Sequence, residues 1–95
     1  MVYYAERSIL IVVYYLITCR SLTYAQKVAR ALDRAGITAT ILRTPQGISR
    51  EGCSYCVKVS ERRGALALRV LNETDTSYNR VYIQHSDGST REVAL

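Results

Sequence analysis

Hydrophobic and polar positions change their spacing several times along the chain, and each stretch of constant spacing predicts one secondary-structure element. Residues 8–17 (SILIVVYYLI) are almost continuously apolar and β-branched, which is typical of a central strand covered on at least one face. Residues 22–35 then place apolar side chains at helical spacing, with Ser21 as a good N-cap and Gly36 as a good residue beyond the C-terminus. The first part of the chain therefore predicts a strand followed by a well-capped helix.

The second part of the chain predicts shorter elements. Four further segments have strand-like patterns: 37–43, 56–60, 80–85 and 90–95. Residues 62–71 predict a second helix capped by Ser60, although Gly64 in its first turn weakens it by roughly 1 kcal/mol relative to alanine. Residues 46–55 predict a loop and residues 72–79 a polar linker, and the Asp87-Gly88 turn introduces the last strand.

This order of elements, βαββαβ with a terminal hairpin extension, predicts the fold class. Right-handed crossovers convert it into a ferredoxin-like α+β sandwich, with one antiparallel sheet and two helices on one of its faces. A length of 95 residues, of which 48% are hydrophobic, suits a single domain over residues 1–95. That size excludes large enzymes with several cofactors.

Net charge, the longest apolar run and the number of cysteines indicate which partners and which cellular location the protein has. The net charge of +5 permits an anionic partner but also suits simple solubility, and the basic residues are spread along the chain. The longest apolar run, residues 9–17, is much shorter than the roughly 18 residues of a membrane span, so we expect no membrane partner. Three cysteines, an odd number, do not complete a disulfide framework, so we expect a reducing, cytoplasmic location.

Eight tyrosines raise the alternative of RNA binding, because RNA-recognition motifs share this topology and stack bases on aromatic side chains of the sheet. Residues 56–60, however, contain no aromatic residue, and Tyr14 and Tyr15 point to opposite sides of one strand. We therefore expect the tyrosines to pack the sheet and the helices, and we do not favour nucleic acid as a partner.

The predicted topology gathers all three thiols at one rim of the sheet, beside the N-terminus of the first helix. Cys19 ends the first strand, and Cys53 and Cys56 lie where the third strand begins. The thiolate is the nucleophilic form of cysteine, and positive charge or helix amides lower a thiol pKa. Three arginines share this predicted rim and would reinforce the effect: Arg20, Arg43 and Arg50.

Each cysteine also has a purely structural interpretation. Cys19 suits a buried apolar filler, and Cys56 could equally face the core or take part in chemistry. Cys53 lies between glycine and serine in a polar loop, which favours a functional role.

The Cys53-x-x-Cys56 spacing is not that of a thioredoxin motif, because it runs into a strand instead of opening a helix. A zinc site needs a fourth ligand, and the single histidine, His85, is predicted at the opposite rim. We therefore predict neither a metal nor a cofactor. Because no histidine could activate a nucleophile at this rim, hydrolytic catalysis is disfavoured, and whether the protein is an enzyme stays open.

Residues 16–59 resemble a bacterial family of small domains described as putative sulfur/selenium carrier-like. The resemblance is carried by a strand, a serine-capped alanine-rich helix with an "AGI" ending, a "P-x-x-I-S" element and a following cysteine. In this chain these are Leu16-Ile17-Thr18, Ser21–Ala31, Ala35-Gly36-Ile37, Pro45-Gln46-Gly47-Ile48-Ser49 and Gly52-Cys53-Ser54-Tyr55. The chain departs from the pattern in Gln46, where arginine is frequent, in Cys19, where an apolar aromatic residue is common, and in the additional Cys56.

The resemblance implies that Cys53 carries a sulfur or selenium atom as a persulfide-type adduct. We expect a donor protein to supply the atom, an acceptor protein to remove it, Cys56 to act as a resolving thiol and Cys19 as a third contact. The expected binding residues for the terminal anion are Ser49, Gly52, Ser54, Arg20 and Arg50.

The alternative is a non-enzymatic regulatory module of ferredoxin-like type that binds a small ligand. Exposed edges at the second strand or the last hairpin would allow a homodimer. The carrier hypothesis further predicts that iodoacetamide modifies Cys53 faster than Cys19 at neutral pH.

Overall fold

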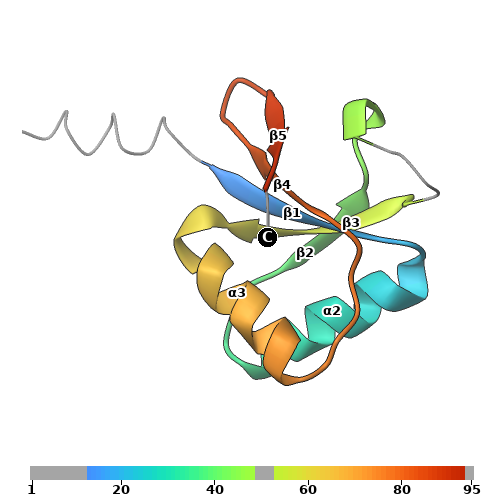
Figure 1. Ribbon diagram of the computed structural model, residues 1–95, viewed down its shortest axis with the longest axis vertical. Coiled ribbons are helices and arrows are strands. Elements are labelled where there is room, and N and C mark those ends of the chain that lie inside the picture. The colour runs from blue at the N-terminus through green and yellow to red at the C-terminus, as the bar shows by residue number, and fades with distance from the viewer. Residues whose placement is uncertain (1–12, 49–52, 94–95) are drawn as a thin grey trace, which may run out of the picture.

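The computed structural model describes residues 13–48 and 53–93. Its elements are β1 (Tyr14–Cys19), α2 (Leu22–Arg34), β2 (Thr40–Arg43), the 3₁₀ turn η1 (Gln46–Ile48), β3 (Tyr55–Ser60), α3 (Glu61–Glu73), β4 (Val81–Gln84) and β5 (Thr90–Glu92). The strands form one sheet in the order β2-β3-β1-β4-β5, and every neighbouring pair is antiparallel. Both helices cover the same face of this sheet (Figure 1). The prediction of an α+β fold with an antiparallel sheet and two helices is confirmed.

The boundaries of several predicted elements differ from the observed ones. Of the strand predicted at 8–17, residues 8–12 lie outside the described part of the chain, and β1 continues to Cys19. The second strand starts at Thr40 instead of residue 37, because the Ile37 amide is engaged by the end of α2. α3 is longer than predicted, and β5 ends at Glu92, with residues 94–95 outside the described chain.

The capping signals of α2 act as predicted. The Ser21 hydroxyl accepts a hydrogen bond from the Tyr24 amide at 3.4 Å. At the other end, Gly36 has a φ of +79°, a left-handed conformation that glycine adopts without steric cost. The amides of Gly36 and Ile37 then donate to the carbonyls of Asp33 and Leu32, both at 2.9 Å, which completes a Schellman motif.

The predicted cap of α3 is only partly correct. Ser60 occupies the N-cap position, but its side chain makes no capping hydrogen bond. The Glu61 amide donates instead to the Val13 carbonyl at 3.0 Å, and the Glu61 carboxylate suits the positive end of the helix dipole. Backbone contact with the chain preceding β1 therefore replaces the expected side-chain cap.

Apolar residues are buried on both faces of the sheet, which explains the unbroken apolar run of β1. On the helix-covered face, the largest buried residues are Ile17, Leu32, Ile37, Leu71, Val28, Val57, Val59 and Val81. On the other face, a smaller cluster contains Leu16, Ile48, Cys56 and Tyr82. Because Leu16 and Ile17 point in opposite directions and are both 0% exposed, β1 shows no polar alternation.

Gly64 permits a close approach between α3 and β1. A Cβ atom at this position would lie 2.6 Å from Cε2 of the Tyr15 ring. We expect Gly64→Ala to lower the free energy of unfolding by about 1–3 kcal/mol through overpacking, although alanine is the better helix former by about 1 kcal/mol. Urea unfolding measures the change.

The matched background is Tyr15→Leu, in which the planar ring is absent. There the cost of Gly64→Ala should shrink or change sign. A Gly64→Ala variant that is more stable than the wild-type protein would contradict the close packing of α3 on Tyr15.

Candidate functional site

The predicted rim of the sheet is present. Tyr55, the first residue of β3, lies opposite both Cys19 at the end of β1 and Arg43 at the end of β2. Arg43 also places its guanidinium 5.3 Å from the centre of the Tyr55 ring. His85 follows Gln84, which pairs with Tyr14 at the start of β1, so the histidine lies at the opposite rim as predicted.

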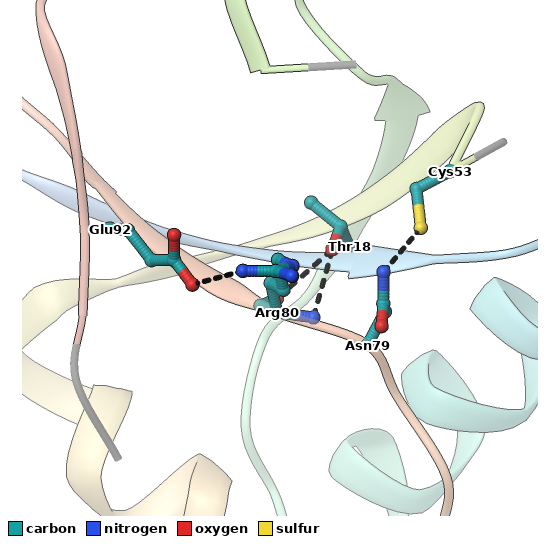
Figure 2. Close-up of polar contacts among 5 residues, drawn as sticks. All are labelled: Thr18, Cys53, Asn79, Arg80 and Glu92. Atoms are coloured by element: carbon teal, nitrogen blue, oxygen red, sulfur yellow. Dashed lines mark hydrogen bonds and ion pairs between the residues drawn. The ribbon is translucent and has the colours of Figure 1, made fainter. Parts of the chain in front are cut away.

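Cys53 is held at this rim immediately before β3. The Thr44 amide donates to the carbonyl of Ser54 at 2.9 Å, which fixes the backbone next to the cysteine. The Cys53 side chain is buried, with 2% exposed, and its sulfur accepts a hydrogen bond from Asn79 Nδ2 at 2.7 Å (Figure 2). Among the described residues, Cys53 belongs to neither of the two apolar clusters of the sheet. Cys53 is thus buried like a core residue, and the Asn79 amide is a polar neighbour of its sulfur.

Asn79 is positioned by backbone pairing between the end of β1 and the segment that leads into β4. The Asn79 amide donates to the Thr18 carbonyl and the Thr18 amide donates to the Arg80 carbonyl, each at 2.8 Å. The Thr18 hydroxyl accepts from the Arg80 amide at 3.0 Å, and the Arg80 guanidinium forms a 2.8 Å ion pair with Glu92 on β5. Figure 2 shows how these contacts place the Asn79 side chain against Cys53.

A small cavity of about 70 Å³ has Asn79 among its lining residues. Its lining consists of Cys19, Arg20, Tyr24, Ser77, Tyr78 and Asn79. None of these described residues is acidic, and Arg20 contributes a positive charge. Lys27 adds a second cation nearby, since its ammonium lies 5.6 Å from the centre of the Tyr24 ring. Asn79 thus touches the Cys53 sulfur and also forms part of the cavity wall.

Cys19 is a buried member of the core on the helix-covered face. It is 1% exposed, and its thiol donates to the Ile17 carbonyl at 3.7 Å. Burial, followed by negative charge on Cys56 and Cys53, raises the pKa of the Cys19 thiol to about 12. The prediction that the basic rim lowers this pKa is wrong, because loss of hydration is the largest cause of the shift and raises the pKa.

Cys56 packs on the opposite face of the sheet, in the cluster with Leu16 and Tyr82. Burial raises its pKa to about 11, although the Thr44 hydroxyl and the Lys58 ammonium lower it. Thr44 Oγ1 is buried and has no hydrogen-bond partner in the described chain, so it is available to a thiolate. The lowered pKa predicted for this thiol is also wrong.

The remaining predicted site residues divide into two groups. Arg20 is exposed at the cavity, and Ser54 is exposed beside Cys53. Ser49, Arg50 and Gly52 lie outside the described residues. Within ranges 13–48 and 53–93, no group of three or more histidine, cysteine or acidic residues could hold a metal ion.

Asn79 is the neighbour of Cys53 that sequence reasoning missed. It lies in the segment 72–79, where no periodic or motif signal distinguishes it from other polar residues. The antiparallel pairing of β1 with β4 could have predicted this neighbour, because it brings the start of β4 beside the end of β1.

The described fold and rim define a small α+β domain with a buried loop cysteine beside a cation-lined cavity. The model of the family described as "Putative Se/S carrier protein-like" matches residues 14–83, and the chain belongs to this family. No curated protein and no solved structure matches the chain. In the described residues, neither helix is long and apolar enough to cross a membrane.

Proposed function

We propose that this protein carries a sulfur or selenium atom on Cys53. In the loading step, the Cys53 thiolate attacks the outer sulfur of a donor persulfide, and a new S–S bond forms on Cys53. The S–S bond of the donor breaks, and its electron pair leaves with the donor thiolate. The transferred sulfur keeps its oxidation state, so the step needs neither an oxidant nor a reductant.

The observation that carries this proposal is the 2.7 Å contact between Asn79 Nδ2 and the Cys53 sulfur. An amide N–H directed at sulfur is a stronger donor to a thiolate or to a persulfide anion than to a neutral thiol. Burial protects such an adduct from water and from other thiols. Family membership supports the same cargo.

In this proposal Cys19 and Cys56 remain protonated neighbours. Their raised pKa values leave little thiolate at neutral pH, whereas the attacking group in thiol exchange has to be a thiolate. The donor and the acceptor are proteins that present a persulfide or a receiving thiol at the rim.

We further infer a ferredoxin-like class for the fold. The support is the order of the first four strands, β4-β1-β3-β2 when β5 is omitted, together with antiparallel pairing throughout. In this arrangement β5 extends the sheet beside β4.

Cysteine persulfide tests the carrier proposal on the reduced full-length protein. We expect the intact mass to rise by about 32 Da, the mass of one sulfur atom, and peptide mapping to place the adduct on Cys53. Dithiothreitol should remove it. An adduct mapped to Cys19 or Cys56 alone, or no adduct at all, would overturn the assignment.

A further inference from the structure

We propose that the cavity beside Cys53 binds a small dianionic chalcogen donor of the thiosulfate and selenosulfate class. This inference rests on the proposed function of Cys53 as the acceptor, and it names a donor that needs no partner protein. Its basis is the position of the cavity, whose wall includes the same Asn79 that touches the Cys53 sulfur.

The size of the cavity suits a donor of a few atoms. A water molecule occupies about 30 Å³ of liquid, and an apolar cavity of about 150 Å³ accepts benzene. At about 70 Å³, this cavity has room for a compact anion.

The charge of the lining favours an anion with several oxygens. Arg20 carries a planar guanidinium, a group that binds oxyanions through paired hydrogen bonds, and none of the described lining residues carries a carboxylate. The other described lining residues are Cys19, Tyr24, Ser77, Tyr78 and Asn79, most of which carry hydroxyl or amide groups. A lining that is rich in hydrogen-bond donors suits a sulfonate group.

The atoms and electrons of the sulfur transfer balance, so the step needs no additional reagent. The Cys53 thiolate attacks the terminal sulfur of thiosulfate and forms an S–S bond, which leaves a persulfide anion on Cys53. The bond from that sulfur to the sulfonate sulfur breaks, and its electron pair departs with sulfite. With selenosulfate, the same step leaves a selenium atom bound to Cys53.

Arg20 stabilises the sulfite leaving group during the transfer. The Asn79 amide donates a hydrogen bond to the Cys53 sulfur both before and after the transfer. Asn79 is an exposed residue, and rotation of its side chain is the route by which the anion would reach the buried sulfur in this proposal.

The test compares thiosulfate with cysteine persulfide as donors to the reduced full-length protein and to Arg20→Gln. Thiosulfate should load the wild-type protein and release one sulfite for each adduct. Arg20→Gln should slow loading from thiosulfate about tenfold or more, the value of one charge-assisted contact, and should slow loading from cysteine persulfide by a clearly smaller factor. Arg69→Gln, which removes the same charge from an exposed position of α3, should leave both rates unchanged.

The outcomes separate the two proposals. Loading from cysteine persulfide but not from thiosulfate would overturn the donor assignment and leave the carrier function intact. An equal loss of both rates in Arg20→Gln would also overturn the donor assignment. Failure of both donors with the wild-type protein would overturn the carrier function itself.

Discussion

Cys53→Ser is expected to abolish persulfide loading, with no mass increase of about 32 Da under conditions that load the wild-type protein completely. Serine keeps the size and the hydrogen-bonding capacity of the side chain, so the contact with Asn79 can persist. Its hydroxyl is, however, not ionised at neutral pH, and the only histidine of the chain lies at the opposite rim. Intact-mass spectrometry after a timed exposure to cysteine persulfide measures the effect.

The matched control for this variant is Cys56→Ala. Cys56 is equally buried, but its side chain lies on the sheet face away from the helices. We expect this variant to load as the wild-type protein does. Complete loading of Cys53→Ser would refute the proposed carrier cysteine, and a ligand-dependent thermal shift that survives Cys53→Ser would favour the regulatory-module alternative.

The native Cys19 thiol is expected to react with iodoacetamide at least roughly a thousandfold more slowly than an ordinary thiol at neutral pH. Its pKa is raised from 9.0 to about 12, so each of three units removes a factor of ten from the thiolate population. Below pH 12 the rate should rise about tenfold per pH unit while the fold persists. Peptide mapping after timed alkylation at several pH values measures the rate at each cysteine.

Alkylation in concentrated urea is the control, because unfolding should make the three thiols react at similar rates. A native Cys19 rate equal to its rate in urea would contradict the burial of this side chain.

The raised pKa values of the buried thiols also make the stability of the fold depend on pH. Cys19 and Cys56 have pKa values that are higher in the folded chain, so their stabilising contribution is complete below pH 9.0 and is lost as the pH rises through about 11 and 12.

Much of the framework could be predicted because it depends on local pattern. The spacing of Ala25, Val28 and Leu32 predicts the buried face of α2, and Ser21 and Gly36 predict its ends. The alternating pattern of residues 56–60 predicts β3 to within one residue. These features require only chain geometry and side-chain polarity.

The chemistry of the thiols could not be predicted in the same way. The arginines near the rim are visible in the sequence, but the loss of hydration that raises the pKa of Cys19 depends on packing from distant segments. Likewise, a polar loop suggests an exposed Cys53, whereas the structure buries its side chain and places Asn79 against the sulfur. The low helix propensity of Gly64 is visible in the sequence, but its close approach to Tyr15 depends on how α3 packs on β1.

The position of β1 between β3 and β4 has a consequence for hydrogen exchange. Both edges of β1 are paired, and at its end the Thr18 amide is bonded to Arg80 while the Thr18 carbonyl accepts from Asn79. Amide protons in such a strand exchange with deuterium only when the domain unfolds as a whole. The backbone that supports Asn79 is thus bonded to a strand whose amide protons should be among the slowest to exchange.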